Sequence, residues 1–112
     1  MPWSATHRGA QISARKARLV IDMIRGRNAA EALDLLKFTP KRASYMIRKV
    51  LQSAVSNAQS QGDADREALF VSAARIDEGT PLKRLKMGDR GRMFVIKRRT
   101  SHIHIEVDQA QA

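Results

Sequence analysis

His102 and His104 could do metal chemistry, because two histidines that alternate along a strand share a face and could bind one ion. A stable metal site needs a third or fourth ligand, and the chain offers only one other histidine, His7, and no cysteine. Ser101 directly precedes His102, but no acidic partner is placed to orient that histidine as a general base. We therefore expect no metal and no nucleophilic site here.

A second candidate is the acidic cluster Asp63, Asp65 and Glu67, which has the spacing that begins a calcium loop. Ala68 stands where such a loop requires glycine, and no glutamate follows at the twelfth position. The cluster is interpreted as a solvated connection. No glycine-rich phosphate loop followed by Lys-Ser or Lys-Thr occurs either. The sequence thus predicts neither an enzyme nor a cofactor.

The cations form the stronger pattern. The whole chain has 21 Lys and Arg against 11 Asp and Glu, a net charge of +10. Between residues 75 and 99, only Asp77, Glu78 and Asp89 oppose nine basic residues, so nine minus three gives a local charge of +6. Segregated positive charge of this kind predicts a polyanionic partner, most often nucleic acid. The nine are Arg75, Lys83, Arg84, Lys86, Arg90, Arg92, Lys97, Arg98 and Arg99.

Strand-like runs flank this segment, and glycines and a proline punctuate its middle, which predicts a hairpin over about 75–99. A continuous strand over 93–107 would extend on the order of 50 Å at ~3.3 Å per residue. A compact chain of this size has a radius of gyration of about 13 Å, so we expect the hairpin to protrude. A disordered basic loop is the alternative, which the strand formers 94–96 disfavour. The predicted tip comprises Leu82, Lys83, Arg84, Met87, Gly88, Asp89, Arg90 and Gly91.

Three helices are predicted to support the hairpin. The first spans 14–25 with Ser13 as its N-cap, and its early cations Arg15, Lys16 and Arg18 oppose the helix dipole, which favours an external anion. The second opens at Asn28 and stops before Pro40. The third, with Thr39 as its cap and Pro40 in its first position, runs to about residue 61. Its basic flank over 37–49 fits a solvated face and a phosphate-facing face equally well.

The remaining elements are strands. An edge strand is expected over 5–12. Alternation predicts that Leu69, Val71 and Ala73 face the core, and that Ile103, Ile105 and Val107 do so on the returning strand. The expected fold class is α+β, with three helices packed on a small antiparallel sheet and a long protruding basic hairpin. We expect one domain over residues 1–112.

Composition bears on the cellular location of the protein and on how it would bind nucleic acid. No apolar run approaches the ~20 residues that span a membrane, and the start of the chain has no signal-peptide core, so a cytosolic protein is expected. Aromatic residues make up only 4% of the chain, which disfavours stacking on single-stranded bases. Contacts to the phosphate and ribose of a folded RNA fit better.

A set of motifs running in order from about residue 5 to 107 resembles the family of ribosomal protein twenty-two of the large subunit. They are Ser13-x-Arg15-Lys16-x-Arg18, Ile24-Arg25-Gly26, Ala32-Leu33-x-x-Leu36-x-Phe38-x-Pro40-Lys41, Val50-Leu51-x-Ser53-Ala54-x-x-Asn57-Ala58, Asp77-Glu78-Gly79, Lys83-Arg84, Gly91-Arg92 and Arg99-Thr100-Ser101-His102-Ile103. Any one motif alone is weak, but jointly they are specific.

The resemblance implies a small domain on the subunit surface and a hairpin that reaches through ribosomal RNA to the wall of the peptide exit tunnel. The implied partners are large-subunit ribosomal RNA, neighbouring ribosomal proteins and the nascent peptide, with no membrane and no homo-oligomer. The implied role is structural: RNA binding, subunit assembly and shaping of the tunnel. The candidate RNA contacts are Arg15, Lys16, Arg18, Arg25, Lys83, Arg84, Lys86, Arg90, Arg92, Lys97, Arg98 and Arg99.

The sequence departs from the family at Gly88 and Asp89, where its members usually carry an Arg-Ala pair. We expect Arg90 or Arg92 to neutralise Asp89. Two rival functions are weighed: a free-standing binder of double-stranded nucleic acid, for which no recognition helix is evident, and a membrane-surface protein, for which the helices are too alanine-rich.

Overall fold

The computed structural model describes residues 3–62 and 65–109, apart from the side chains of Arg66 and Asp89. The helices are α1 (Ala14–Ile21), α2 (Ala29–Phe38) and α3 (Arg42–Gly62), with short 3₁₀ segments η1 (Arg66–Ala68) and η2 (Asp89–Gly91). The strands are β1 (Trp3–Ala10), β2 (Leu69–Glu78), β3 (Leu82–Met87), β4 (Met93–Arg98) and β5 (Ser101–Gln109). Strands β1, β5 and β2 form an antiparallel sheet in that order, and β3 pairs only with β4. The α+β fold with a protruding hairpin is thereby confirmed.

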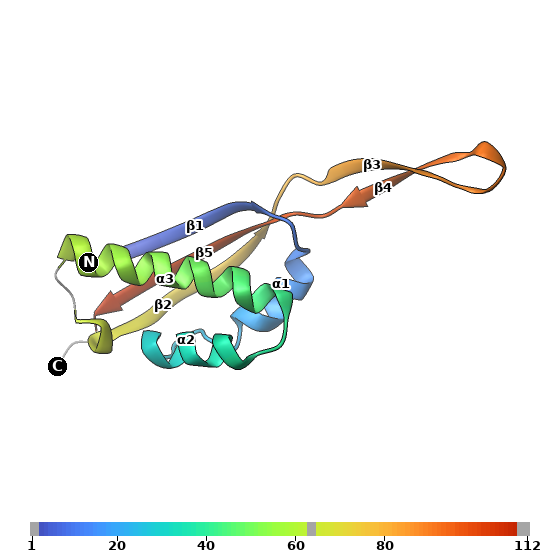
Figure 1. The fold of residues 1–112 in the computed structure, drawn as a ribbon. Helices are drawn as coiled ribbons and strands as arrows, with labels where there is room; N and C mark the ends of the chain where they lie inside the picture. Colours follow the sequence, from blue (N-terminus) through green and yellow to red (C-terminus); the bar gives the residue numbers. More distant parts are fainter. Residues whose placement is uncertain (1–2, 63–64, 110–112) are drawn as a thin grey trace.

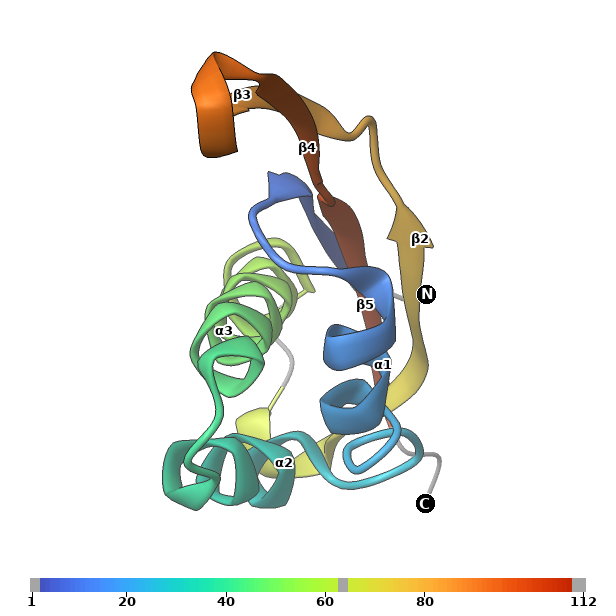
Figure 2. The ribbon, with the colours of Figure 1, turned by 90° about the vertical axis from the view of Figure 1, so that its right-hand side faces the viewer.

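The helices all lie on one face of the three-stranded sheet (Figure 1). Viewed from the hairpin end, α3 lies beside α1 over this face, and α2 lies below both helices (Figure 2). The central strand β5 supplies three fully buried side chains, Ile103, Ile105 and Val107, as its alternation predicts. Ile47 and Leu51 of α3 meet them in the same core.

The helix boundaries follow from local hydrogen bonds. Ser13 caps α1 as predicted, but the α-helix ends at Ile21 rather than at Arg25. Met23 N–H donates to the Val20 carbonyl at 3.0 Å and Ile24 N–H to that of Ile21 at 3.2 Å. These three-residue spacings tighten the chain into turns that still bury Ile24.

Thr39 does not cap the third helix. Its hydroxyl donates to the Leu35 carbonyl at 2.7 Å and its N–H to that of Leu36 at 3.3 Å, so both groups close the end of α2. Helix α3 therefore starts at Arg42, two residues beyond Pro40. Asn28 does cap α2, since its side chain accepts from Ala30 N–H at 2.9 Å.

The prediction that Ala73 faces the core is wrong, because β2 contains a β-bulge. Val71 pairs with Val107 and Ala73 with Glu106, so Ser72 is an extra residue on the bulged strand. The side-chain alternation shifts by one at that point. As a result Ala74 and Ile76, rather than Ala73, face the core with Leu69 and Val71.

The returning strand is not continuous, because Arg99 and Thr100 separate β4 from β5. The hairpin nonetheless leaves the body of the molecule (Figure 1). The principal extents are 67 × 25 × 17 Å and the radius of gyration is 17.0 Å, against about 13 Å for a compact chain of this length. Among the described residues, no helix is both long and apolar enough to cross a membrane.

Candidate nucleic-acid interface at the hairpin base

The hairpin is fastened where it leaves the sheet. Gly79 N–H donates to the Thr100 carbonyl at 2.9 Å, and the Thr100 hydroxyl donates to the Thr80 carbonyl at 2.7 Å. A Cβ on Gly79 would lie 2.5 Å from the Thr100 hydroxyl oxygen, so this close approach requires glycine. These contacts join the two strands of the hairpin where they leave the sheet.

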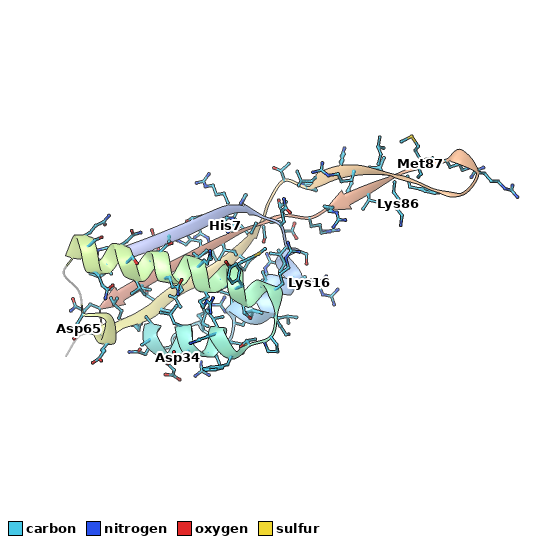
Figure 3. All side chains as sticks on the ribbon, in the orientation of Figure 1. His7, Lys16, Asp34, Asp65, Lys86 and Met87 are labelled. Atoms are coloured by element: carbon cyan, nitrogen blue, oxygen red, sulfur yellow. The ribbon has the colours of Figure 1, made fainter. Side chains whose placement is uncertain are left out.

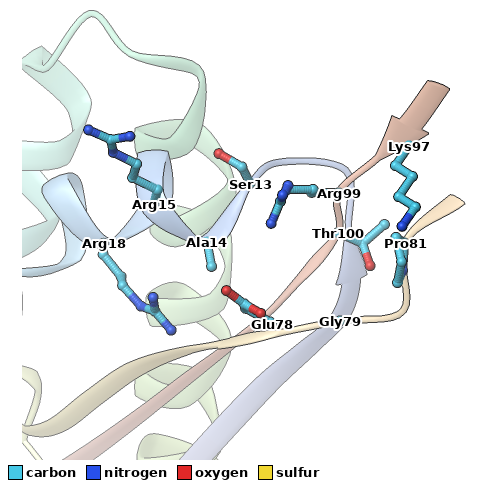
Figure 4. Close-up of a pocket in the computed structure, with 10 residues that line it drawn as sticks. All are labelled: Ser13, Ala14, Arg15, Arg18, Glu78, Gly79, Pro81, Lys97, Arg99 and Thr100. Carbon is cyan, nitrogen blue, oxygen red and sulfur yellow. The ribbon is translucent and has the colours of Figure 1, made fainter.

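Two adjoining cavities open at this junction. The first cavity, of about 610 Å³, lies between α1 and the hairpin base (Figure 4). Its lining residues are Ser13, Ala14, Arg15, Arg18, Glu78, Gly79, Pro81, Lys97, Arg99 and Thr100. The second cavity, of about 800 Å³, is lined by Gln11, Ile12, Ser13, Lys16, Arg42, Leu82, Arg84, Ile96, Lys97, Arg98, Arg99 and Thr100.

The cavities bring together cations that are far apart in the sequence. Seven of the predicted contacts line one cavity or both: Arg15, Lys16, Arg18, Arg84, Lys97, Arg98 and Arg99. Among the residues that the structure describes, Glu78 is the only acidic one in either lining. The ion pairs between described Lys or Arg and acidic side chains use Arg25, Arg27 and Arg75, none of which lines a cavity. The clustered cations are therefore left available to an external anion.

Arg42 is a cavity residue absent from the predicted contacts. It opens α3, and the first turn of that helix has no acidic residue. The same argument that singled out Arg15, a cation opposing the helix dipole, would have found it.

Arg18 and Arg25 have a structural role as well as a charge. Arg18 donates to the Ile76 carbonyl from Nε at 3.3 Å and from Nη2 at 3.0 Å. Arg25 bonds the Ala74 carbonyl in the same way and also pairs with Asp22 at 2.7 Å. Arg25 does not line either cavity, so the structure separates it from the clustered cations.

The predicted tip is wrong for Leu82, Lys83 and Arg84. These residues begin β3 and pair with the end of β4, Leu82 with Arg98 and Lys83 with Lys97. They therefore lie at the base of the hairpin. The observed tip is the turn between Met87 and Met93, with Gly88 N–H donating to the Arg92 carbonyl at 2.6 Å.

The turn has a left-handed backbone at Arg90 (φ 60°) and Gly91 (φ 73°). A Cβ on Gly88 would overlap the ring of Phe94, so a residue without a side chain makes room for this aromatic ring. The Arg90 and Arg92 side chains are exposed. The expected neutralisation of Asp89 lies outside the described side chains.

One face of the hairpin combines like charges with exposed apolar side chains. Lys83 and Lys97 are directly opposite one another on one face, where like charges repel. Beyond them on that face lie four exposed apolar residues, Leu85, Met87, Met93 and Val95. Figure 3 shows Lys86 and Met87 well away from the body of the molecule, with Lys16 near the hairpin base. Cations and apolar groups exposed together this far from a core are typical of an interaction surface.

His102 and His104 make hydrogen bonds between strands of the sheet. His102 Nδ1 accepts from Gly9 N–H at 3.0 Å, and His104 Nδ1 lies 2.7 Å from the Thr6 hydroxyl oxygen. Both contacts join β5 to β1. Over the described residues, no group of three or more His, Cys, Asp or Glu side chains could hold a metal ion.

The family model described as ribosomal protein L22p/L17e matches residues 5–108. The chain belongs to the ribosomal protein L22p/L17e family. It is 52% identical over 103 residues to the large ribosomal subunit protein uL22 of Ligilactobacillus salivarius, covering 92% of this chain and 90% of that protein. It is 48% identical over 109 residues to the uL22 of Lacticaseibacillus casei, covering 97% and 93%. The uL22 of Carboxydothermus hydrogenoformans is 50% identical over 97 residues, covering 87% and 86%.

Membership of the L22p/L17e family confirms the resemblance that the motifs indicate. It identifies the chain as a structural protein of the large ribosomal subunit, in the ribosome of the cytoplasm. The hairpin and the basic cavities are thus features of a ribosomal protein, whose partners include ribosomal RNA and other ribosomal proteins.

Proposed function

We propose that this L22-family chain binds large-subunit ribosomal RNA mainly through the hairpin base. One observation carries the proposal: eight cations from α1, α3, β3, β4 and the β4–β5 connection line two adjoining cavities, in which Glu78 is the only acid among the described side chains. Arginine forks and lysine point charges on a concave surface are suited to phosphate oxygens. The exposed cations of the hairpin, including Lys83, Lys86, Arg90 and Arg92, extend this surface toward the tip.

The same surface supports a role in subunit assembly. The body and the hairpin together extend 67 Å, so one chain can contact RNA segments that are far apart. Binding two such segments at once makes the second contact intramolecular, which favours the folded arrangement of the RNA. The tip, farthest from the body, is the part that we propose lines the exit tunnel and meets the nascent peptide.

Salt dependence tests the RNA proposal. Replacing Arg15, Lys97 and Arg99 together by alanine removes three cations of the first cavity. Each neutralised phosphate releases about 0.7–0.9 of a counterion, so the slope of log affinity against log salt should become shallower by roughly two to three units. The measurement is filter binding of the protein to purified large-subunit ribosomal RNA across a salt series.

A charge-matched variant makes the experiment specific. Replacing Lys37, Lys41 and Lys49 by alanine removes the same charge from exposed positions outside both cavities. We expect this variant to change the slope less. Equal slopes for the two variants would show that the hairpin base has no preference over the basic flank at 37–49, and an unchanged slope in the first variant would remove the hairpin base from the interface.

A further inference from the structure

Glu78 is an anomaly in the first cavity. Within the described part of the chain it is the only acidic residue in either lining, and it stands at the end of β2, paired with Ser101 of β5. Its side chain is exposed and makes no ion pair with any described Lys or Arg side chain. Figure 4 shows the Glu78 carboxylate pointing across the cavity toward the first turn of α1, with Arg18 and Arg99 to either side. Both carboxylate oxygens are therefore free to accept hydrogen bonds from a ligand.

A simple anion does not explain this arrangement. A phosphate would bind better without the carboxylate, because the two negative charges repel. A metal ion does not explain it either, since four cations, Arg15, Arg18, Lys97 and Arg99, surround one carboxylate. The ligand that fits carries negative charge on one part and hydrogen-bond donors on another. A nucleotide has this combination.

The position of two acceptor oxygens selects among the bases. Guanine presents two adjacent donors, N1–H and the N2 amino group, on its Watson–Crick edge. Adenine and cytosine each present one amino group beside a ring nitrogen that accepts, which a carboxylate would repel, and uracil presents a single N–H between two carbonyl groups. A carboxylate can accept from both guanine donors at once.

We propose that the first cavity binds a single unpaired guanine nucleotide of ribosomal RNA, with Glu78 accepting from guanine N1–H and N2–H. The inference rests on the proposed RNA-binding function and names the chemical group read at that site. Arg15 and Arg99 hold the adjoining phosphates. Arg18 is already oriented by its two bonds to Ile76, which leaves its Nη1 group free for the ligand. The volume of about 610 Å³ accommodates one nucleotide.

The probe is 5′-GMP, compared with 5′-IMP, 5′-AMP, 5′-CMP and 5′-UMP, titrated into the full chain and followed by backbone-amide chemical shifts in NMR spectra. We expect 5′-GMP to shift the amides of Ser13, Gly79 and Thr100 and to bind at least about fivefold more tightly than 5′-AMP or 5′-CMP. 5′-IMP should fall between them, because it keeps N1–H and lacks the N2 amino group.

Two variants localise the effect. Glu78→Gln replaces one acceptor oxygen by a donor and should abolish the preference for 5′-GMP. Asp34→Asn changes the net charge by the same amount at an exposed position on α2 and should keep the preference. Equal affinities for all five nucleotides, no detectable binding of 5′-GMP, or an undiminished preference in Glu78→Gln would each overturn the inference.

Failure of the inference is distinguishable from failure of the proposed function. Filter binding of the wild-type chain to large-subunit ribosomal RNA is measured beside the titrations. RNA binding without a guanine preference removes only the base-reading role of Glu78. A chain that shows no salt-dependent binding to the RNA removes the proposed function itself.

Discussion

The guanidinium of Arg25 donates two hydrogen bonds to the carbonyl oxygen of Ala74, at 3.2 Å from Nε and 2.8 Å from Nη2. Ala74 lies on β2, an edge strand of the sheet. One edge of β2 pairs with β5, and the Ala74 carbonyl belongs to the opposite edge, which has no neighbouring strand in this sheet. Arg18 bonds the Ile76 carbonyl in the same way, and Gly26 N–H bonds that of Val71 at 3.1 Å. The segment from α1 to Gly26 thus satisfies and covers an edge that could otherwise pair with another chain.

Arg25→Ala should lower the free energy of unfolding by about 1–2 kcal/mol, because it leaves the Ala74 carbonyl without its charged donor. The figure is kept modest because the Arg25 side chain is 49% exposed. The measurement is urea unfolding followed by circular dichroism. Arg15→Ala, an exposed arginine on α1, is the control and should stay within about 0.5 kcal/mol of wild type. Equal losses in the two variants would contradict a structural role for Arg25.

The sequence predicts the order and type of the main elements, because capping residues and apolar periodicity are local signals. Ser13 and Asn28 mark helix starts that the structure confirms, and the third helix ends at Gly62, within one residue of its predicted end. The bulge at Ser72 has no such signal: nothing in Leu69 to Ile76 shows that one residue will be skipped in the pairing. Alternation fails there because register depends on the partner strand.

The bulge gives a second prediction. Ala74 is buried at 6% exposure whereas Ala73 is only partly buried. Ala74→Asp should cost about 3 kcal/mol or more, because it places an unpaired charge in the core. Ala73→Asp should be much less damaging. Thermal unfolding of the two variants decides, and the opposite ranking would mean that β2 follows simple alternation without a bulge.

The candidate site is predictable in its parts and unpredictable in its arrangement. Charge segregation identifies Arg15 and Arg99 from sequence, but their meeting at one cavity depends on how α1 packs against β2 and on the fastening of the hairpin at Thr100. The sequence places Lys83 and Arg84 at the tip, because glycines and a proline make all of 79–92 resemble one loop. The pairing of Leu85 with Val95 shows that part of that segment, Leu82–Met87, is strand.

Tyr45 gives a pH-dependent prediction. Lys49 lowers the pKa of the Tyr45 phenol. The hydrogen bond from Lys49 is the largest cause, its positive charge is the next, and the charge of Arg48 lowers the pKa further. The cationic neighbours favour the phenolate, so ionisation should occur below the ordinary value near 10. Tyr45 is the only tyrosine in the chain, so the absorbance of tyrosinate reports it alone.

The matched variants for this titration are Lys49→Gln and Lys41→Gln. Lys49→Gln should raise the midpoint toward the ordinary value, because it removes the largest cause of the shift. Lys41→Gln removes the same charge from a position that does not contribute to the shift and should leave the midpoint unchanged. A midpoint insensitive to Lys49→Gln would show that the contact does not persist in solution.

The hairpin should be mobile in the free protein. A two-stranded ribbon without a third strand or a helix against it is marginal in water, and β3 and β4 pair only with one another. Backbone relaxation by NMR should give lower order parameters over β3, the turn and β4 than over α3. Addition of large-subunit ribosomal RNA should raise them. A hairpin as rigid as α3 in the absence of RNA would instead favour an independently folded binding module.

The exit-tunnel proposal requires a hairpin that is shortened without disturbing its pairing. Deleting Leu82, Lys83 and Arg84 from β3 alone would shift that strand against β4 and reverse its faces. Deleting two residues from each strand, Lys86 and Met87 with Met93 and Phe94, keeps Leu85 opposite Val95 and keeps both faces. The hairpin becomes shorter by about 7 Å at ~3.3 Å per residue.

The shortened chain removes no buried residue, so its free energy of unfolding should stay within about 0.5 kcal/mol of wild type. Ribosomal subunits should still assemble, because Arg15, Lys97 and Arg99 remain at the hairpin base. Stalling by sensor nascent peptides should change, because cations and apolar groups no longer extend to the same depth. The measurement is a stalling assay on ribosomes that carry the variant, with Arg15→Ala ribosomes as the control for weakened RNA binding. Failed assembly together with normal stalling in the surviving particles would make the tip an assembly clamp rather than part of the tunnel wall.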